Sequence, residues 1–155
     1  MKFVKSAATT LIALAVVATP TTVQAEAIDQ AEAVRKLDIM LMVTGLRCRR
    51  TADNFQQDYQ RFSSNHLTAL NAASRTLQAN LVKKSGAQGA KRALDKISVG
   101  MANEYGNGHP WLGCAELKQI ARNLATDKDS TRLAATADEL LSNRPRGQWA
   151  MLGTR

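Results

Sequence analysis

The chain has 155 residues, of which 21 are Lys or Arg and 13 are Asp or Glu, giving a formal net charge of +8 at neutral pH. This length argues for one domain, and an apolar fraction of 45% is too high for a disordered chain. With 9 Gly, 3 Pro and 5% aromatic residues, the composition disfavours a β-sandwich, a β-barrel or a collagen-like chain.

The N-terminal segment has the features of a secretory signal peptide. Lys2 and Lys5 make its beginning positively charged, and the apolar run Leu11–Ala18 follows. This run and its neighbours are too short to span the roughly 30 Å of hydrocarbon in a bilayer. Small residues then precede two cleavage points, after Ala25 and, as the second choice, after Ala27.

We therefore divide the chain into a cleaved signal peptide, 1–25, and one domain, 26–155. Cleavage removes two of the 21 basic residues and none of the 13 acidic ones, so the mature protein stays basic. The mature part has no second apolar run of bilayer length, so no stable transmembrane segment is expected after cleavage. The predicted location is the periplasm or the outside of the cell.

Apolar residues recur at three- and four-residue steps through the domain, which predicts helices. A first helix is expected over about 26–44, and Gly45 either ends or weakens it. A long second helix is expected over about 52–83, and the polar residues 63–65 would allow a bend in it.

The sequence of the second half of the domain predicts three shorter helices. The segment 85–89 has the composition of a linker, and a third helix is expected over about 90–105. A fourth helix is expected to start at Pro110, and Asp129 or Ser130 to cap a fifth. No useful alternating strand pattern occurs. The predicted fold is all-α, a single bundle of about five helices with one disulfide.

Cys48 and Cys114 are the only cysteines of the chain. Two cysteines in an exported protein most often pair, so a disulfide is expected between them. A reactive thiol is the alternative, because the three arginines around Cys48 would lower its pKa if it were free. Two cysteines also exclude a disulfide-dense scaffold and a zinc site made of cysteines alone.

The segment 103–114 holds the most distinctive residues, because glycines, an imidazole, an indole and a cysteine meet there at a helix junction. The candidate ligand-binding residues in it are Glu104, Tyr105, His109 and Trp111. A structural role is the alternative: the glycines supply unusual backbone angles, and Trp111 packs beside the disulfide. At such a junction, the His109 side chain is expected to be exposed.

His66 falls on the apolar stripe of the second helix, where an interior imidazole with a satisfied hydrogen bond is expected. No His-x-x-x-His and no carboxylate pair accompanies the two histidines, so no metal site and no cofactor are predicted. A non-covalent haem is an alternative, held by His66 or His109. Its second ligand would be Met40, Met42 or Met101. Covalent haem is excluded, because Cys-x-x-Cys-His is absent.

No catalytic residue is predicted. The acidic residues are scattered, and no pair of them stands out as a general acid and a general base. Gly-x-Ser-x-Gly, the P-loop and the dinucleotide fingerprint are all absent. A non-catalytic protein is therefore favoured over an enzyme.

Basic residues provide a second set of candidate ligand-binding residues, namely Arg47, Arg49 and Arg50, and further basic pairs occur at 83–84 and 91–92. Nucleic acid would suit a cytosolic chain of this charge, but export and the lack of interleaved aromatic residues argue against it. The expected partner is an anionic envelope component or an acidic protein. A basic face that is merely solvated is the alternative.

Three features together resemble small exported helical proteins of Gram-negative bacteria. The first is the signal peptide, and the second is the segment Thr51-Ala52-Asp53-Asn54-Phe55. The third is the run Asn-Gly-His-Pro-Trp-Leu-Gly-Cys, which ends with the second of two widely spaced cysteines. The resemblance implies no activity and carries over no site residue. The acid-stress periplasmic chaperones share the small helical build and the single bridge, but not the sequence pattern.

The expected function is that of a periplasmic, non-catalytic protein that binds a partner, as an envelope or stress accessory protein. One alternative is an envelope enzyme that uses the loop of His109 and Trp111 with Glu104. Another is a carrier of a small ligand or metal in a cavity between helices. A deep pocket that gathers His109, Glu104 and an arginine would favour the enzyme.

Overall fold

The computed structural model describes residues 21–141. Within this range the chain forms five helices and no strand, which confirms the all-α prediction. The helices are α1 (Thr21–Cys48), α2 (Gln56–Asn65), α3 (Leu67–Tyr105), α4 (Cys114–Thr126) and α5 (Ser130–Leu141). Most of the predicted signal peptide, residues 1–20, lies outside the described residues, so export stays a prediction.

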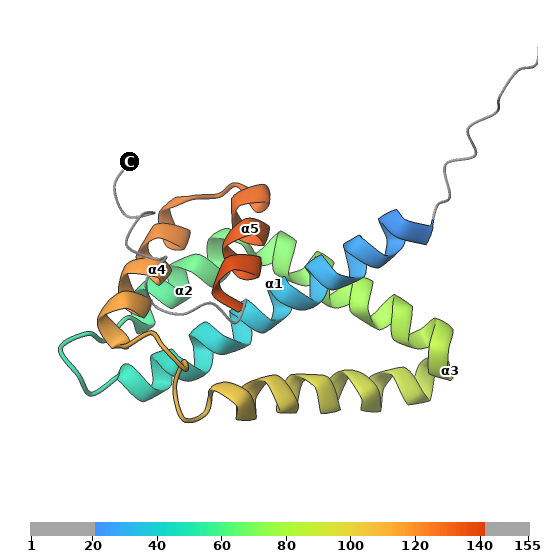
Figure 1. Cartoon of the computed structure of the whole chain (residues 1–155), viewed down its shortest axis with the longest axis horizontal. Helices are drawn as coiled ribbons and strands as arrows, with labels where there is room; N and C mark the ends of the chain where they lie inside the picture. The colour runs from blue at the N-terminus through green and yellow to red at the C-terminus, as the bar shows by residue number, and fades with distance from the viewer. Residues whose placement is uncertain (1–20, 142–155) are drawn as a thin grey trace, which may run out of the picture.

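The helices are arranged around α1. In Figure 1, α1 runs diagonally through the molecule, α3 folds back on itself at the lower right, and α2, α4 and α5 lie together at the upper left. α1 packs mainly against α3 and α5, and α2 packs against α4. α1 is therefore the element that joins the two sides of the bundle.

The core lies where α1 meets its neighbours. Leu37 and Leu41 of α1 are fully buried one turn apart, as the apolar stripe predicts, and the rings of Phe55 and Phe62 are buried in the same cluster. A Cβ atom at Gly45 would lie 3.3 Å from the Phe55 ring. The missing side chain at Gly45 therefore lets this ring approach α1 closely.

The prediction of one continuous helix over 52–83 is wrong. The chain leaves helical geometry at His66, with φ −104° and ψ 12°, and this residue separates α2 from α3. The residues just before it are Ser, Ser and Asn, which compete with helix formation. Asn65 donates its side-chain N–H to the carbonyl of Ala125 at 2.6 Å. The break lets α2 pack on α4 while α3 packs on α1.

The predicted linker 85–89 is helical except at one residue. Gly86 adopts φ 68° and ψ 172°, and it divides α3 into a first leg, 67–85, and a second leg, 87–105. Glycine reaches this backbone region without a steric penalty, whereas other residues do not. One glycine is therefore enough to turn the chain back along the bundle (Figure 1).

The fourth helix starts later than expected, at Cys114 rather than Pro110. The carboxylate of Glu116 accepts the backbone N–H of Gly113 at 2.6 Å, which satisfies a donor at the start of α4. For the fifth helix the prediction is confirmed, because Asp129 accepts the N–H of Thr131 at 2.8 Å.

Candidate functional site

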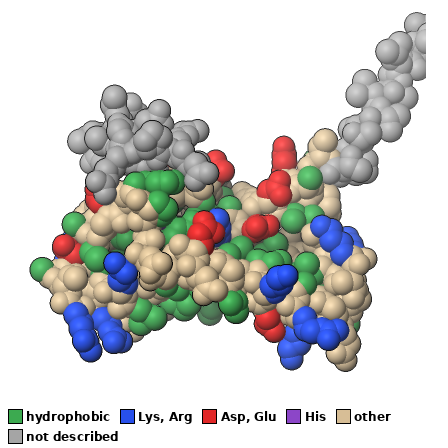
Figure 2. Space-filling model, turned by 60° about the horizontal axis from the view of Figure 1, so that its bottom comes forward, with side chains coloured by type: hydrophobic (Ala, Val, Ile, Leu, Met, Phe, Trp, Pro, Cys, Tyr) green, Lys and Arg blue, Asp and Glu red, His purple; other side chains and the backbone are tan. Residues whose placement is uncertain are grey.

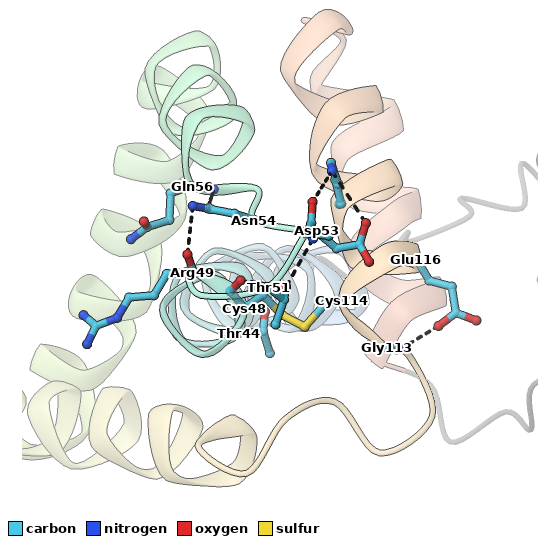
Figure 3. Close-up of a disulfide and its surroundings, with 12 residues drawn as sticks. Thr44, Cys48, Arg49, Thr51, Asp53, Asn54, Gln56, Gly113, Cys114 and Glu116 are labelled. Atoms are coloured by element: carbon cyan, nitrogen blue, oxygen red, sulfur yellow. Dashed lines mark hydrogen bonds and ion pairs between the residues drawn. A yellow bond between two sulfur atoms is a disulfide. The ribbon is translucent and has the colours of Figure 1, made fainter.

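The predicted disulfide is confirmed. Cys48 ends α1 and Cys114 begins α4, and the two residues are joined with Cα atoms 5.7 Å apart. Figure 3 shows the bridge between these two helix ends. Cys48 is buried, and no free thiol is left for the reactive-cysteine alternative, since these are the only two cysteines of the sequence.

The turn that follows α1 is fixed by further contacts. Asn54 donates its side-chain N–H to the carbonyl of Arg49 at 3.1 Å. Lys118 of α4 donates to the carbonyl of Ala52 at 3.0 Å and lies 3.6 Å from the carboxylate of Asp53. These contacts, several of which are drawn in Figure 3, give the backbone of this turn one defined position.

Three arginines surround this turn, and we call Arg47, Arg49 and Arg50 the arginine corner. All three side chains are exposed, and none forms an ion pair with any residue in the described range. The sequence between residues 39 and 52 contains no Asp or Glu. The corner is therefore a local positive charge without an ion-pair partner among the described residues, since Asp53 of the same turn faces Lys118.

A second basic surface lies on α3, on both sides of its turn at Gly86. The only acidic residue between positions 75 and 96 is Asp95. None of the cations there forms an ion pair within residues 21–141. Figure 2 shows Lys and Arg side chains gathered over this lobe, at the right. We call these exposed cations the basic elbow; they are Arg75, Lys83, Lys84, Lys91, Arg92 and Lys96.

The loop between α3 and α4 brings three of the predicted site residues together. The rings of Tyr105 and His109 are stacked with centroids 5.8 Å apart, and the ring of Trp111 meets His109 edge-on at 5.3 Å. Gly108 has φ 105°, and a Cβ atom there would lie 3.4 Å from the Arg47 guanidinium. Arg47 is thus the arginine that lies against this loop.

The expectation that His109 is exposed is wrong, since its exposed fraction is 8%. Its Nε2 atom lies 3.2 Å from the carbonyl oxygen of Leu140, and its Nδ1 atom accepts the backbone N–H groups of Trp111 and Leu112 at 3.4 and 3.3 Å. These partners require a neutral ring with its proton on Nε2. Burial lowers the pKa of His109, which agrees with a neutral ring.

The carboxylate of Glu104 forms an ion pair with α1. It pairs with Lys36 of α1 at 2.9 Å, and the Lys36 ammonium lies 5.8 Å from the centre of the Tyr105 ring. Burial, with a further contribution from the Glu104 carboxylate, raises the pKa of Tyr105 above its ordinary value. These groups join α1 to the end of α3.

The prediction for His66 is confirmed. Its exposed fraction is 3%, and its Nε2 atom lies 3.0 Å from the carbonyl oxygen of Leu124. The ring also contacts Phe62, with centroids 5.3 Å apart. His66 is therefore an interior residue that connects the junction of α2 and α3 to the end of α4.

A groove on the described surface lies away from the predicted loop. It has a volume of about 660 Å³ and runs between α1, the first leg of α3 and the start of α5. Small side chains form its floor, among them Ala31, Ala73 and Ala134, and His66 and Lys128 also line it. The groove is not lined by His109, Glu104 or the arginine corner. It is therefore not the pocket that would favour an enzyme.

The exposure of two apolar residues was not predicted from the sequence, in which Met42 was considered only as a possible haem ligand. Met42 and Leu46 are large apolar side chains of α1, yet their exposed fractions are 41% and 50%. Both lie off the buried stripe of Leu37 and Leu41, and this offset is the signal that could have found them.

The described residues offer no metal centre, because no three of their His, Cys, Asp and Glu side chains are grouped to hold an ion. Nor does any helix within 21–141 combine the length and the apolar character that crossing a bilayer requires.

Comparison with known proteins gives no relative. No protein-family model matches the chain, and neither a curated protein nor a solved structure is significantly similar to it.

Proposed function

We propose that this protein is exported to the periplasm or secreted, and that it acts there without catalysis by binding an anionic partner of the cell envelope. The observation that carries the proposal is the set of exposed cations in the basic elbow and the arginine corner, none of which is paired within the described residues. Clusters of one sign attract ligands of the opposite sign.

Most cations elsewhere on the described surface form ion pairs, although Lys128 is exposed and forms none there. Lys36 pairs with Glu104 at 2.9 Å, and Arg132 pairs with Asp127 at 2.8 Å. Such pairs reduce the field that reaches the solvent. Apart from Lys128, the cations that form no ion pair within residues 21–141 lie in these two places, and this concentration supports a binding role over a uniformly solvated basic face.

The surroundings of His109 support a protein without catalysis over the envelope enzyme. A general base needs a free lone pair within reach of a substrate. The Nδ1 lone pair of His109 accepts two backbone N–H groups, and its Nε2 atom faces the carbonyl of Leu140. Glu104, the predicted companion, pairs with Lys36 at 2.9 Å.

Export is tested by expressing the full chain in a Gram-negative host, fractionating the cells and measuring the intact mass of the product. We expect a periplasmic protein that begins at Glu26 or Ile28 and is lighter by the two hydrogens lost in the disulfide. A cytosolic protein that retains residues 1–25 would contradict the proposal.

Anion binding is tested on the exported protein by its elution from immobilised heparin with increasing salt. Lys83→Gln/Lys84→Gln removes two unpaired cations, whereas Arg122→Gln/Arg132→Gln removes two that face Asp58 and Asp127. We expect a clearly lower elution salt for the first variant only. Equal shifts would mean that net charge alone matters and would contradict a localised site.

The groove between α1, α3 and α5 favours a second candidate function, the carriage of a small ligand. Its volume of about 660 Å³ lies in the range of small-molecule sites. Native mass spectrometry of the protein from the periplasm tests this candidate. A carrier would show an adduct that is lost when Ala73→Phe fills the groove, and a spectrum without any adduct would contradict it.

A further inference from the structure

The last two turns of α1 expose an apolar pair beside the arginine corner. Met42 and Leu46 are four residues apart, so they lie on the same face of the helix. Arg49 and Arg50 follow Leu46 by three and four residues, just past the end of the helix. One end of the molecule therefore combines two exposed apolar side chains with three guanidinium groups that form no ion pair within the described part of the chain.

We propose that this end of α1 docks onto the surface of an anionic phospholipid bilayer. In this arrangement Met42 and Leu46 enter the headgroup region, and the arginine corner binds lipid phosphates. The inference rests on the proposed function and names the partner class, which that function leaves open.

Charge complementarity supports a lipid phosphate as the ligand. A guanidinium group presents its N–H donors in a planar fork that fits phosphate oxygens in pairs. No Asp or Glu occurs between residues 39 and 52, and Asp53, which follows, lies 3.6 Å from the Lys118 ammonium and forms no ion pair with these arginines within the described range. A basic cluster beside an anionic leaflet is also a recognised source of membrane affinity.

The small apolar area favours a bilayer over a folded protein partner. A stable protein–protein interface buries about 800 Å² on each side and needs a complementary surface. Here the apolar part is one pair of side chains, Met42 and Leu46. A bilayer needs no matching pocket, because single apolar side chains can enter it while the charged groups stay at the headgroups.

The corner is held in position before any ligand arrives. The bridge from Cys48 to Cys114 and the hydrogen bond from Asn54 to the Arg49 carbonyl fix the turn, and Figure 3 shows the Arg49 side chain directed away from the disulfide. A preorganised surface loses less conformational freedom on binding.

On the face in Figure 2, apolar side chains run along the lower edge between two groups of Lys and Arg.

The test uses the exported protein, so that the apolar leader does not contribute, and sedimentation with lipid vesicles. We expect binding to phosphatidylcholine vesicles that contain about 30% phosphatidylglycerol, and none to phosphatidylcholine alone. Met42→Gln/Leu46→Gln should lower the partition coefficient about tenfold. Arg49→Gln/Arg50→Gln should lower it about fivefold for each arginine.

Matched control variants separate binding at this site from nonspecific binding to vesicles. Leu67→Gln/Val99→Gln removes two side chains that are 57% and 59% exposed elsewhere, and should leave vesicle binding unchanged. Lys83→Gln/Lys84→Gln removes the same charge from the basic elbow and should have less effect than Arg49→Gln/Arg50→Gln. Circular dichroism and the thermal midpoint verify that each variant is folded.

The outcomes distinguish this inference from the proposed function. Heparin binding without vesicle binding would overturn the lipid docking and leave the proposed function standing, as would binding to polyglutamate but not to vesicles. Vesicle binding that does not depend on Met42 and Leu46, or that depends more on the elbow than on the corner, would overturn this site. Loss of binding to every anionic probe would overturn both.

Discussion

The Nε2 atom of His109 lies 3.2 Å from the carbonyl oxygen of Leu140, and this contact joins the loop before α4 to the last turn of α5. The same ring accepts the backbone N–H groups of Trp111 and Leu112 through Nδ1. One neutral imidazole therefore satisfies backbone groups from two segments that no covalent bridge connects directly. The contact has consequences for stability that can be measured.

The first prediction is a loss of stability on mild acidification. Burial holds the pKa of His109 below its ordinary value of 6.5, so the unfolded chain binds a proton at a pH where the folded chain does not. The stability that the neutral ring contributes is complete above about pH 6.5 and declines as the pH falls towards the folded-state pKa. Urea unfolding midpoints measured between about pH 7.5 and pH 5 should show this decline.

The matched control for this prediction is His109→Gln. A glutamine amide can replace part of the hydrogen bonding but does not titrate, so the variant should be less stable at pH 7 and should show a flatter pH dependence. If wild type and variant have parallel profiles over this range, His109 is not the titrating group.

The second prediction concerns the bridge of Cys48 and Cys114. These residues are 66 positions apart, and closing a loop of that size in the unfolded chain corresponds to about 4 kcal/mol. Cys48→Ala/Cys114→Ala should lower the free energy of unfolding by roughly this amount, measured by urea denaturation at neutral pH. A loss below about 1 kcal/mol would show that the unfolded chain is already constrained without the bridge.

Local patterns were sufficient to predict much of this fold. The stripe of Leu37 and Leu41 gives the buried face of α1, and Asp129 caps α5 as expected. The pairing of Cys48 with Cys114 followed from their number and from the expected compartment. None of these features needed knowledge of contacts between distant helices.

The features that the sequence did not reveal depend on contacts between distant segments. His109 is buried because Leu140, 31 residues later, places a carbonyl against its ring. The break at His66 is supported by the bond from Asn65 to Ala125, 60 residues away. The exposure of Met42 and Leu46 likewise depends on which faces of α1 the other helices cover.

The third prediction concerns the hydrogen bond that joins α2 to α1. Tyr59 donates its hydroxyl to the carboxylate of Asp38 at 3.0 Å, and burial raises the pKa of Asp38 while this bond and Arg35 oppose the rise. Tyr59→Phe should cost about 1–2 kcal/mol at pH 7, because a partly buried carboxylate loses a donor. The cost should shrink as the pH falls and Asp38 becomes protonated, and a cost that is constant with pH would contradict this account.

The fourth prediction compares two glycines of α3. Gly86 has φ 68°, which strains any other residue, whereas Gly100 is helical and a Cβ atom there would meet nothing within 4 Å. Gly86→Ala should therefore destabilise the protein by about 1–3 kcal/mol, and Gly100→Ala should stabilise it by about 0.5–1 kcal/mol. Thermal unfolding of both variants measures the two effects. Because both residues are exposed and both variants add one methyl group, effects of the same sign would argue against the strained turn at Gly86.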